Sequence, residues 1–176
     1  MRETFKVGGT IAVALLLGGA GLAMAPMGSF TATVSGALSA RLNGSAIFQD
    51  VQVTGDSAAT LAWISLAAGG DPEHRIQLSR KTLGAPPAGT YRITDAGAQS
   101  ESASDRSPDE FSAMYERPSG EGAGSFNADS GTVVITSSTA ARVSGRFTFS
   151  ATSDDGGRTI TVAGRFTADR AAVRKR

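Results

Sequence analysis

Two segments near the C-terminus, Arg142–Ala151 and Arg158–Ala168, constrain the fold of this chain more than any other feature. Both alternate apolar with polar residues, and each contains the tetrapeptide Gly-Arg-Phe-Thr. Between them, Asp155-Gly156 is typical of a two-residue type I′ turn, in which both central residues need a positive φ. The two segments are therefore predicted to form an antiparallel β-hairpin.

A turn at Asp155-Gly156 also predicts which residues face each other across the hairpin. Gly145 lies opposite Phe166, and Phe147 lies opposite Gly164. A phenylalanine in this position covers the backbone that the missing glycine side chain leaves bare. The repeated tetrapeptide is thus interpreted first as a packing device on the inward face.

The outward face of the same hairpin contains the candidate binding residues. The predicted register sets Arg146 directly opposite Arg165, and like charges in such a position disfavour pairing. Arg142 faces Asp169 instead, which is a balanced pair. One hypothesis is a small-anion or partner-carboxylate site built by the two guanidinium groups. The alternative is two long side chains that extend into water.

The remainder of the chain is read as further short strands. Phe30–Ala40 alternates, Asn43-Gly44 is either a type I′ turn or a bulge in a continuing strand, and a turn is expected at 129–131. Ala58–Ala68 is apolar enough for a strand or a short helix, and its context favours the strand. About nine strands with turns at this spacing predict an all-β antiparallel sandwich or barrel.

The domain organisation follows from the N-terminal composition. A mildly basic start and the apolar segment Ile11–Ala25 predict a signal peptide or a membrane anchor at 1–25. A single all-β domain is expected at 30–169 and a basic tail at 170–176. The protein is therefore expected to be exported, and to be periplasmic, envelope-associated or secreted.

Composition excludes several classes of function. The chain has no cysteine, which excludes disulfides, thiol catalysis and cysteine-based metal sites. Without Arg2, Glu3 and Lys6 of the N-terminal segment, basic and acidic residues balance, so no nucleic-acid partner is expected. We expect no cofactor, and membrane contact only through the N-terminal segment if it stays uncleaved.

Neither His74 nor the acidic region predicts catalysis. His74, the only histidine, lies in a polar segment, and the chain has no Gly-x-Ser-x-Gly nucleophile motif. We expect a solvated turn histidine and a protein that is not an enzyme. The acidic region 95–121 lacks the EF-hand pattern, and the sequence leaves open whether it binds calcium.

Four segments resemble parts of a family of uncharacterised bacterial exported proteins and lipoproteins. They are Pro87–Ile93, Ser130–Thr136, Val143–Ala151 and Val162–Thr167. The resemblance implies a non-catalytic exported cell-envelope or secreted β-domain that acts by surface contacts with a protein or small-molecule partner. The lipid-modified cysteine of the lipoproteins is missing. A looser resemblance to lipocalins, without their early Gly-x-Trp motif, implies the alternative of a carrier for a small apolar ligand.

Overall fold

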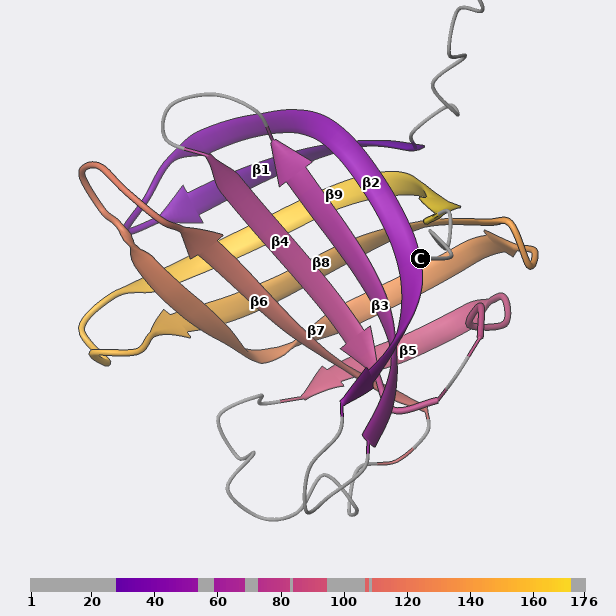
Figure 1. Cartoon of the computed structure of the whole chain (residues 1–176). Helices are drawn as coiled ribbons and strands as arrows, with labels where there is room; N and C mark the ends of the chain where they lie inside the picture. The colour runs from indigo at the N-terminus through magenta and orange to yellow at the C-terminus, as the bar shows by residue number, and fades with distance from the viewer. Residues whose placement is uncertain are drawn as a thin grey trace, which may run out of the picture.

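The computed structural model describes residues 28–53, 59–68, 73–82, 84–94, 107 and 109–171. Within these residues the chain forms nine strands and no helix, and the strands make one mostly antiparallel sheet that closes into a ring (Figure 1). The predicted all-β class is confirmed, and the closed ring is a barrel. The segment predicted as signal peptide or anchor, 1–25, lies outside the described residues. The strands are β1 (Gly28–Gly36), β2 (Ala40–Val53), β3 (Ala59–Ala68), β4 (His74–Arg80), β5 (Gly89–Thr94), β6 (Glu110–Arg117), β7 (Gly124–Ser138), β8 (Arg142–Ser153) and β9 (Thr159–Arg170).

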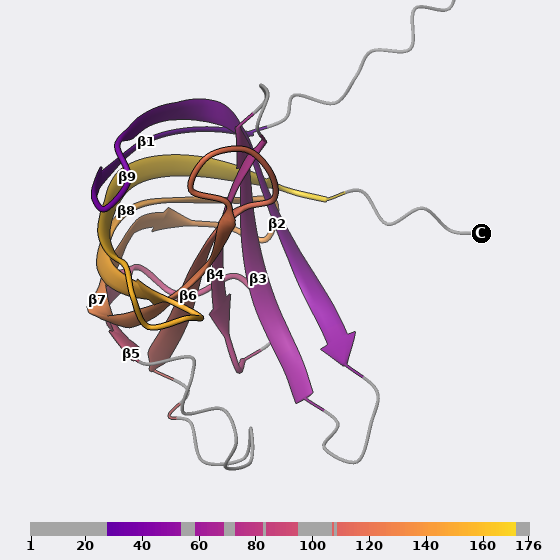
Figure 2. The ribbon, with the colours of Figure 1, turned by 90° about the vertical axis from the view of Figure 1, so that its left-hand side faces the viewer.

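The order of strands around the ring departs from chain order at one place. The neighbours are β1, β2, β3, β4, β6, β5, β7, β8 and β9, and β9 pairs with β1 to close the sheet. Two short parallel contacts join β5 to β6 and β2 to β9. Figures 1 and 2 show β1, β9, β8 and β7 side by side along one wall of the barrel. This wall carries the residues discussed below.

The register predicted for the C-terminal hairpin is confirmed. Gly145 pairs with Phe166 and Phe147 pairs with Gly164. A Cβ atom on Gly164 would lie 2.7 Å from Cζ of Phe147, which shows that the ring occupies the space above the glycine. The two exchanged pairs therefore fix the relative position of β8 and β9.

The turn of this hairpin differs from the prediction. The Ser153 N–H donates to the Arg158 carbonyl, so the loop between them has four residues rather than two. The Gly156 N–H donates to the Ser153 carbonyl, and Gly156 has a φ of 70°. The carboxylate of Asp155 accepts from the Gly157 N–H, which makes the wider loop favourable. The register survives because the loop gains one residue on each side.

Of the two readings of Asn43-Gly44, the continuing strand is confirmed but without the bulge, and the turn predicted at 129–131 is wrong. β2 continues through Asn43-Gly44 without a bulge in its pairing to β1 or β3, and the chain reverses after Gly36 instead. Gly44 is required for close approach, because a Cβ there would lie 2.0 Å from the Ala67 carbonyl oxygen. Likewise β7 runs through 129–131, with a register shift between Ala128 and Ser130. Such a bulge bends a strand and does not end it.

Where the structure describes side chains, they fill the interior of the barrel. Aromatic rings inside it contact one another, for example Tyr91 with Phe111 at 5.3 Å between centroids and Tyr115 with Phe126 at 5.8 Å. Burial of apolar side chains of this size stabilises by about 1.5–3 kcal/mol each. The largest fully buried side chains include Phe48, Ile64, Leu66, Ile76, Phe111, Tyr115, Phe126, Ile135, Phe149 and Ile160.

Substitution of Gly164 by alanine should destabilise the barrel. The new Cβ would lie within 2.8 Å of Phe147, the Thr31 carbonyl and Ala32, and over-packing of this kind costs about 1–3 kcal/mol. Thermal unfolding followed by circular dichroism should show a melting temperature lower by about 2–4 °C for each kcal/mol. Gly157→Ala is the control, because its Cβ would meet only Asp155 Oδ1 at 3.7 Å. An equal loss in both variants would contradict the packing role.

Candidate functional site

Arg146 on β8 and Arg165 on β9 are register partners and both are exposed. They point outward because Gly145, Phe147 and Phe166 beside them point into the barrel, and side chains alternate along a strand. The structure therefore brings the two candidate arginines together at the position that the sequence predicts.

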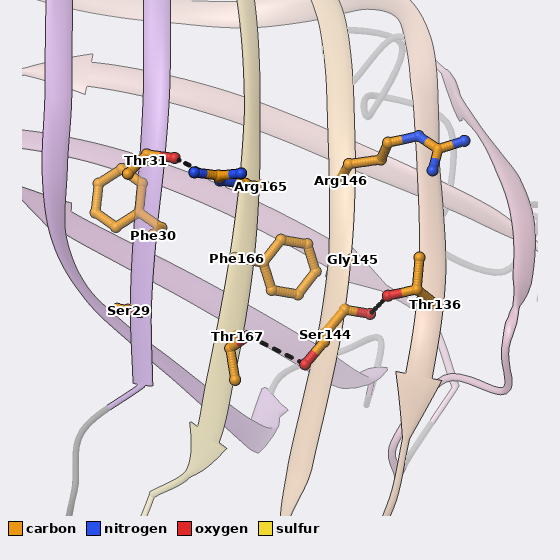
Figure 3. A pocket seen from close by; sticks show the side chains of 10 residues that line it. All are labelled: Ser29, Phe30, Thr31, Thr136, Ser144, Gly145, Arg146, Arg165, Phe166 and Thr167. Carbon is orange, nitrogen blue, oxygen red and sulfur yellow. Dashed lines mark hydrogen bonds between the residues drawn. The ribbon is translucent and has the colours of Figure 1, made fainter.

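The two guanidinium groups are directed away from each other (Figure 3). Arg165 extends toward β1, where its Nε donates to Thr31 Oγ1 at 3.3 Å. Arg146 extends in the opposite direction, toward β7. This arrangement is the one that repulsion between neighbouring cations favours. It leaves the surface between the two side chains open.

Hydroxyl groups cover the surface beside the arginines. Ser144 Oγ donates to Thr167 Oγ1 at 3.1 Å, and Thr136 Oγ1 donates to the Ser144 carbonyl at 3.2 Å (Figure 3). Each hydroxyl can donate one hydrogen bond and accept two more. The surface can thus offer both donors and acceptors to a ligand.

Three shallow hollows lie against this outer surface, and Arg146 lines all of them. The one between β1 and β7 has a volume of about 460 Å³ and is lined by both arginines. A second, toward β2, is lined by Arg165 and by Arg41. They are open hollows over the sheet and not part of its filled interior.

The charges of this surface are unbalanced. Among the described residues, carboxylates pair with other arginines, as in the bridges Arg142–Asp169 and Arg75–Glu73 at 3.0 Å. The exposed Arg41 and Arg146 have no such bridge within the described part of the chain. The surface is therefore locally positive on a chain that is close to neutral overall.

Sequence reasoning missed Arg41 as a member of this surface. Arg41 on β2 lies opposite Thr33 on β1, and Thr33 lies opposite Ala163 on β9. The alternation of Phe30–Val34 was a usable signal for the outward face of β1. Because the sequence left open whether Asn43-Gly44 is a turn or part of a continuing strand, it did not identify the matching position on β2. The outer surface that contains Arg41, Arg146 and Arg165 is termed the arginine face below.

His74 is not a solvated turn residue. It begins β4, is partly buried, and its Nδ1 lies 2.7 Å from the hydroxyl of the fully buried Tyr115. Partial burial, and secondly the charge of Arg117, lower the pKa of His74 below its ordinary value. Burial raises the pKa of Tyr115. The pair is a polar contact at the edge of the core, on another wall from the arginine face.

The acidic region 95–121 is described only in part, because 95–106 and 108 lie outside the described residues. In the described parts of the chain, no three His, Cys, Asp or Glu side chains gather as a metal site would require. Part of the region for which the sequence leaves calcium binding open thus lies outside the described residues. Where the chain is described, it contains no helix long and apolar enough to cross a membrane.

The chain matches no protein-family model, and comparison with curated proteins and with solved structures gives no significant match.

The opposed arginines should weaken the hairpin. Arg165→Glu would replace a like-charge pair by an opposite-charge pair, which is worth about 0.2–1 kcal/mol across two strands. Chemical denaturation should show a more stable protein at low salt. The gain should shrink at 0.5 M NaCl, because the Debye length is then well below its value of about 10 Å in 0.1 M salt and exposed charges are screened from each other. No gain at low salt would show that the two cations do not repel each other.

Stability should fall as the pH is lowered from about 7 toward 5. The unfolded His74 has a pKa near 6.5, above that of the folded state, so the unfolded chain binds protons more readily in this window. Urea unfolding at pH 7, 6 and 5 measures the effect, and His74→Gln should flatten it. The pKa values of Glu73 and Asp155 are also lowered, but they change stability only below about pH 4.5. This change is the same in the unmodified protein and in the His74→Gln variant. An unchanged slope in the variant would contradict the role of His74.

Proposed function

We propose that this chain is a non-catalytic, exported β-barrel domain that acts through contacts of its outer surface, in the periplasm, in the cell envelope or as a secreted protein. The observation that carries the proposal is a combination found among the described residues: the inward side chains fill the barrel, and exposed arginines on its outer face have no ion pair. Binding therefore has a suitable place on the outside of this barrel.

The filled interior favours surface contacts over the carrier alternative. A carrier needs an apolar cavity of several hundred cubic ångströms around its ligand. Here Phe147 contacts both Phe149 and Phe166, with ring centroids 6.0 and 6.3 Å apart, in the centre of the wall behind the arginine face. These rings occupy the space that a ligand would need.

The surroundings of His74 support a non-catalytic role. Its Nδ1 is engaged with the Tyr115 hydroxyl, whose pKa is raised by burial, so Tyr115 holds its proton at neutral pH. Through this contact the side chain of His74, the only histidine of the sequence, packs against the core. Export is proposed on the N-terminal segment Ile11–Ala25 and on the resemblance to exported bacterial proteins.

Native mass spectrometry of the protein purified from its own cell envelope tests the proposal. The expected mass is that of the chain without a bound apolar molecule, and cell fractionation should find the protein outside the cytoplasm. Recovery of a stoichiometric apolar ligand would favour the carrier instead. Recovery in the cytoplasm would overturn the exported part of the proposal.

Phe149→Ala distinguishes a packed interior from a ligand cavity. Phe149 is 1% exposed, and removal of a fully packed phenylalanine costs about 3–5 kcal/mol. Chemical denaturation should show a loss of this size. The neighbouring Thr148→Ala, at an exposed position, should change stability by no more than about 0.5 kcal/mol. A small loss for Phe149→Ala would indicate that its ring faces open space.

A further inference from the structure

Two neighbouring rows of outward side chains cross the barrel wall from β2 to β5. Strand pairing places in the first row Asn43, Thr31, Arg165, Arg146, Val134 and Thr90. It places in the second row Arg41, Thr33, Ala163, Thr148, Thr132 and Arg92. Every charged residue in the two rows is an arginine.

The positive charge is concentrated on the β2 side of the rows. Arg92, at the other end, is the register partner of Glu110 on β6, so a carboxylate stands on the neighbouring strand there. Arg41, Arg165 and Arg146 have no carboxylate in either row. Neighbouring strands lie about 4.8 Å apart, so Arg41 on β2 and Arg146 on β8 are separated by about 14 Å across the sheet. An anion that satisfies all three arginines must therefore be extended.

The rest of the surface is rich in groups that hydrogen-bond to alcohols. Threonine hydroxyls and the amide of Asn43 can each donate and accept. Neither row contains an aromatic side chain, so the surface offers no ring on which a nucleobase could stack. The only apolar side chains of the rows are Val134 and Ala163, which is too little for insertion into a lipid surface.

We infer that the arginine face binds an acidic polysaccharide, with the carboxylates of the polymer on Arg41, Arg146 and Arg165 and its hydroxyl groups on the threonines between them. The inference rests on the proposed function and specifies its partner.

The like-charge pair of Arg146 and Arg165 explains why an anion would bind at this place. The Gly–Phe exchange fixes the register, so Arg146 and Arg165 cannot move apart along their strands. Carboxylates of the polymer beside the two guanidinium groups offset their like charges, and each carboxylate can accept paired N–H donors from the arginine that it faces. The hollow of about 460 Å³ over Gly145 and Phe166 gives such a group room to approach both side chains.

Binding of the full-length protein to polygalacturonate, measured by isothermal titration calorimetry at 50 mM NaCl, tests the inference. Dextran, a neutral polysaccharide, and polyphosphate, a polyanion without hydroxyl groups, are the comparison probes. We expect binding of polygalacturonate that weakens as salt is raised, weaker binding of polyphosphate and none of dextran.

The variants identify the face that binds. The double variant Arg146→Ala and Arg165→Ala should lose at least tenfold in affinity, and Arg41→Ala about threefold, which corresponds to the loss of one exposed charge contact. Lysine at both 146 and 165 should recover only part of the affinity, because an ammonium group lacks the two-pronged geometry. Arg75→Ala is the control, since Arg75 is an exposed arginine on β4 that is bridged to Glu73. Melting temperatures show that each variant is folded.

Three outcomes would overturn the inference: no binding of polygalacturonate by the unmodified protein, equal or tighter binding of polyphosphate, or an equal loss in Arg75→Ala. If polygalacturonate does not bind while the purified protein is exported and free of apolar ligand, the inference fails and the proposed function stands. If an apolar ligand fills the interior, the proposed function itself fails.

Discussion

The contact between glycine backbone and phenylalanine ring in the C-terminal hairpin determines much of the rest of the structure. Because Phe166 covers Gly145 and Phe147 covers Gly164, a shift of one strand by one residue would turn its ring out of the core and uncover the glycine on its neighbour. The fixed hairpin presents β9 to β1 and β8 to β7, and these pairings connect both ends of the sheet into a ring. The same register places Arg146 against Arg165 on the outside. The interior packing thus determines the unfavourable charge pair.

The fold could be predicted from sequence where the signal was local. Alternation and turn residues within one hairpin gave the class and the pairing of β8 with β9 correctly. Glycines were the main source of error, since a glycine is used both where the chain turns and where two backbones approach closely. Gly44 allows close approach to β3. Gly131 lies against the backbone of Phe149, because a Cβ added at Gly131 would lie 2.7 Å from the Cα of Phe149. Only the pairing between distant strands distinguishes these roles.

The candidate site shows the same limit. Arg146 and Arg165 belong to one hairpin, so their juxtaposition follows from a short stretch of sequence. Arg41 reaches the same surface only because β1 bridges β2 and β9 across more than a hundred residues. The contact between His74 and Tyr115 likewise depends on the pairing of β4 with β6, which skips β5. Composition and motif spacing carry no information on such contacts.

In a filled barrel, the residues that determine stability and the residues available for binding lie on opposite faces of the same strands. Inward positions are occupied by large apolar side chains, so substitution there costs stability, whereas outward positions of the same strands contribute little to it. Threonine and serine keep the outward positions compatible with a strand and also supply hydrogen-bonding groups. Against this polar, weakly charged background, three arginines on β2, β9 and β8 that have no ion pair among the described residues produce a local positive potential, which salt screens only partly at short range. The wall of β2, β1, β9 and β8 therefore offers the positive charge on which the proposed recognition of an extended anion depends.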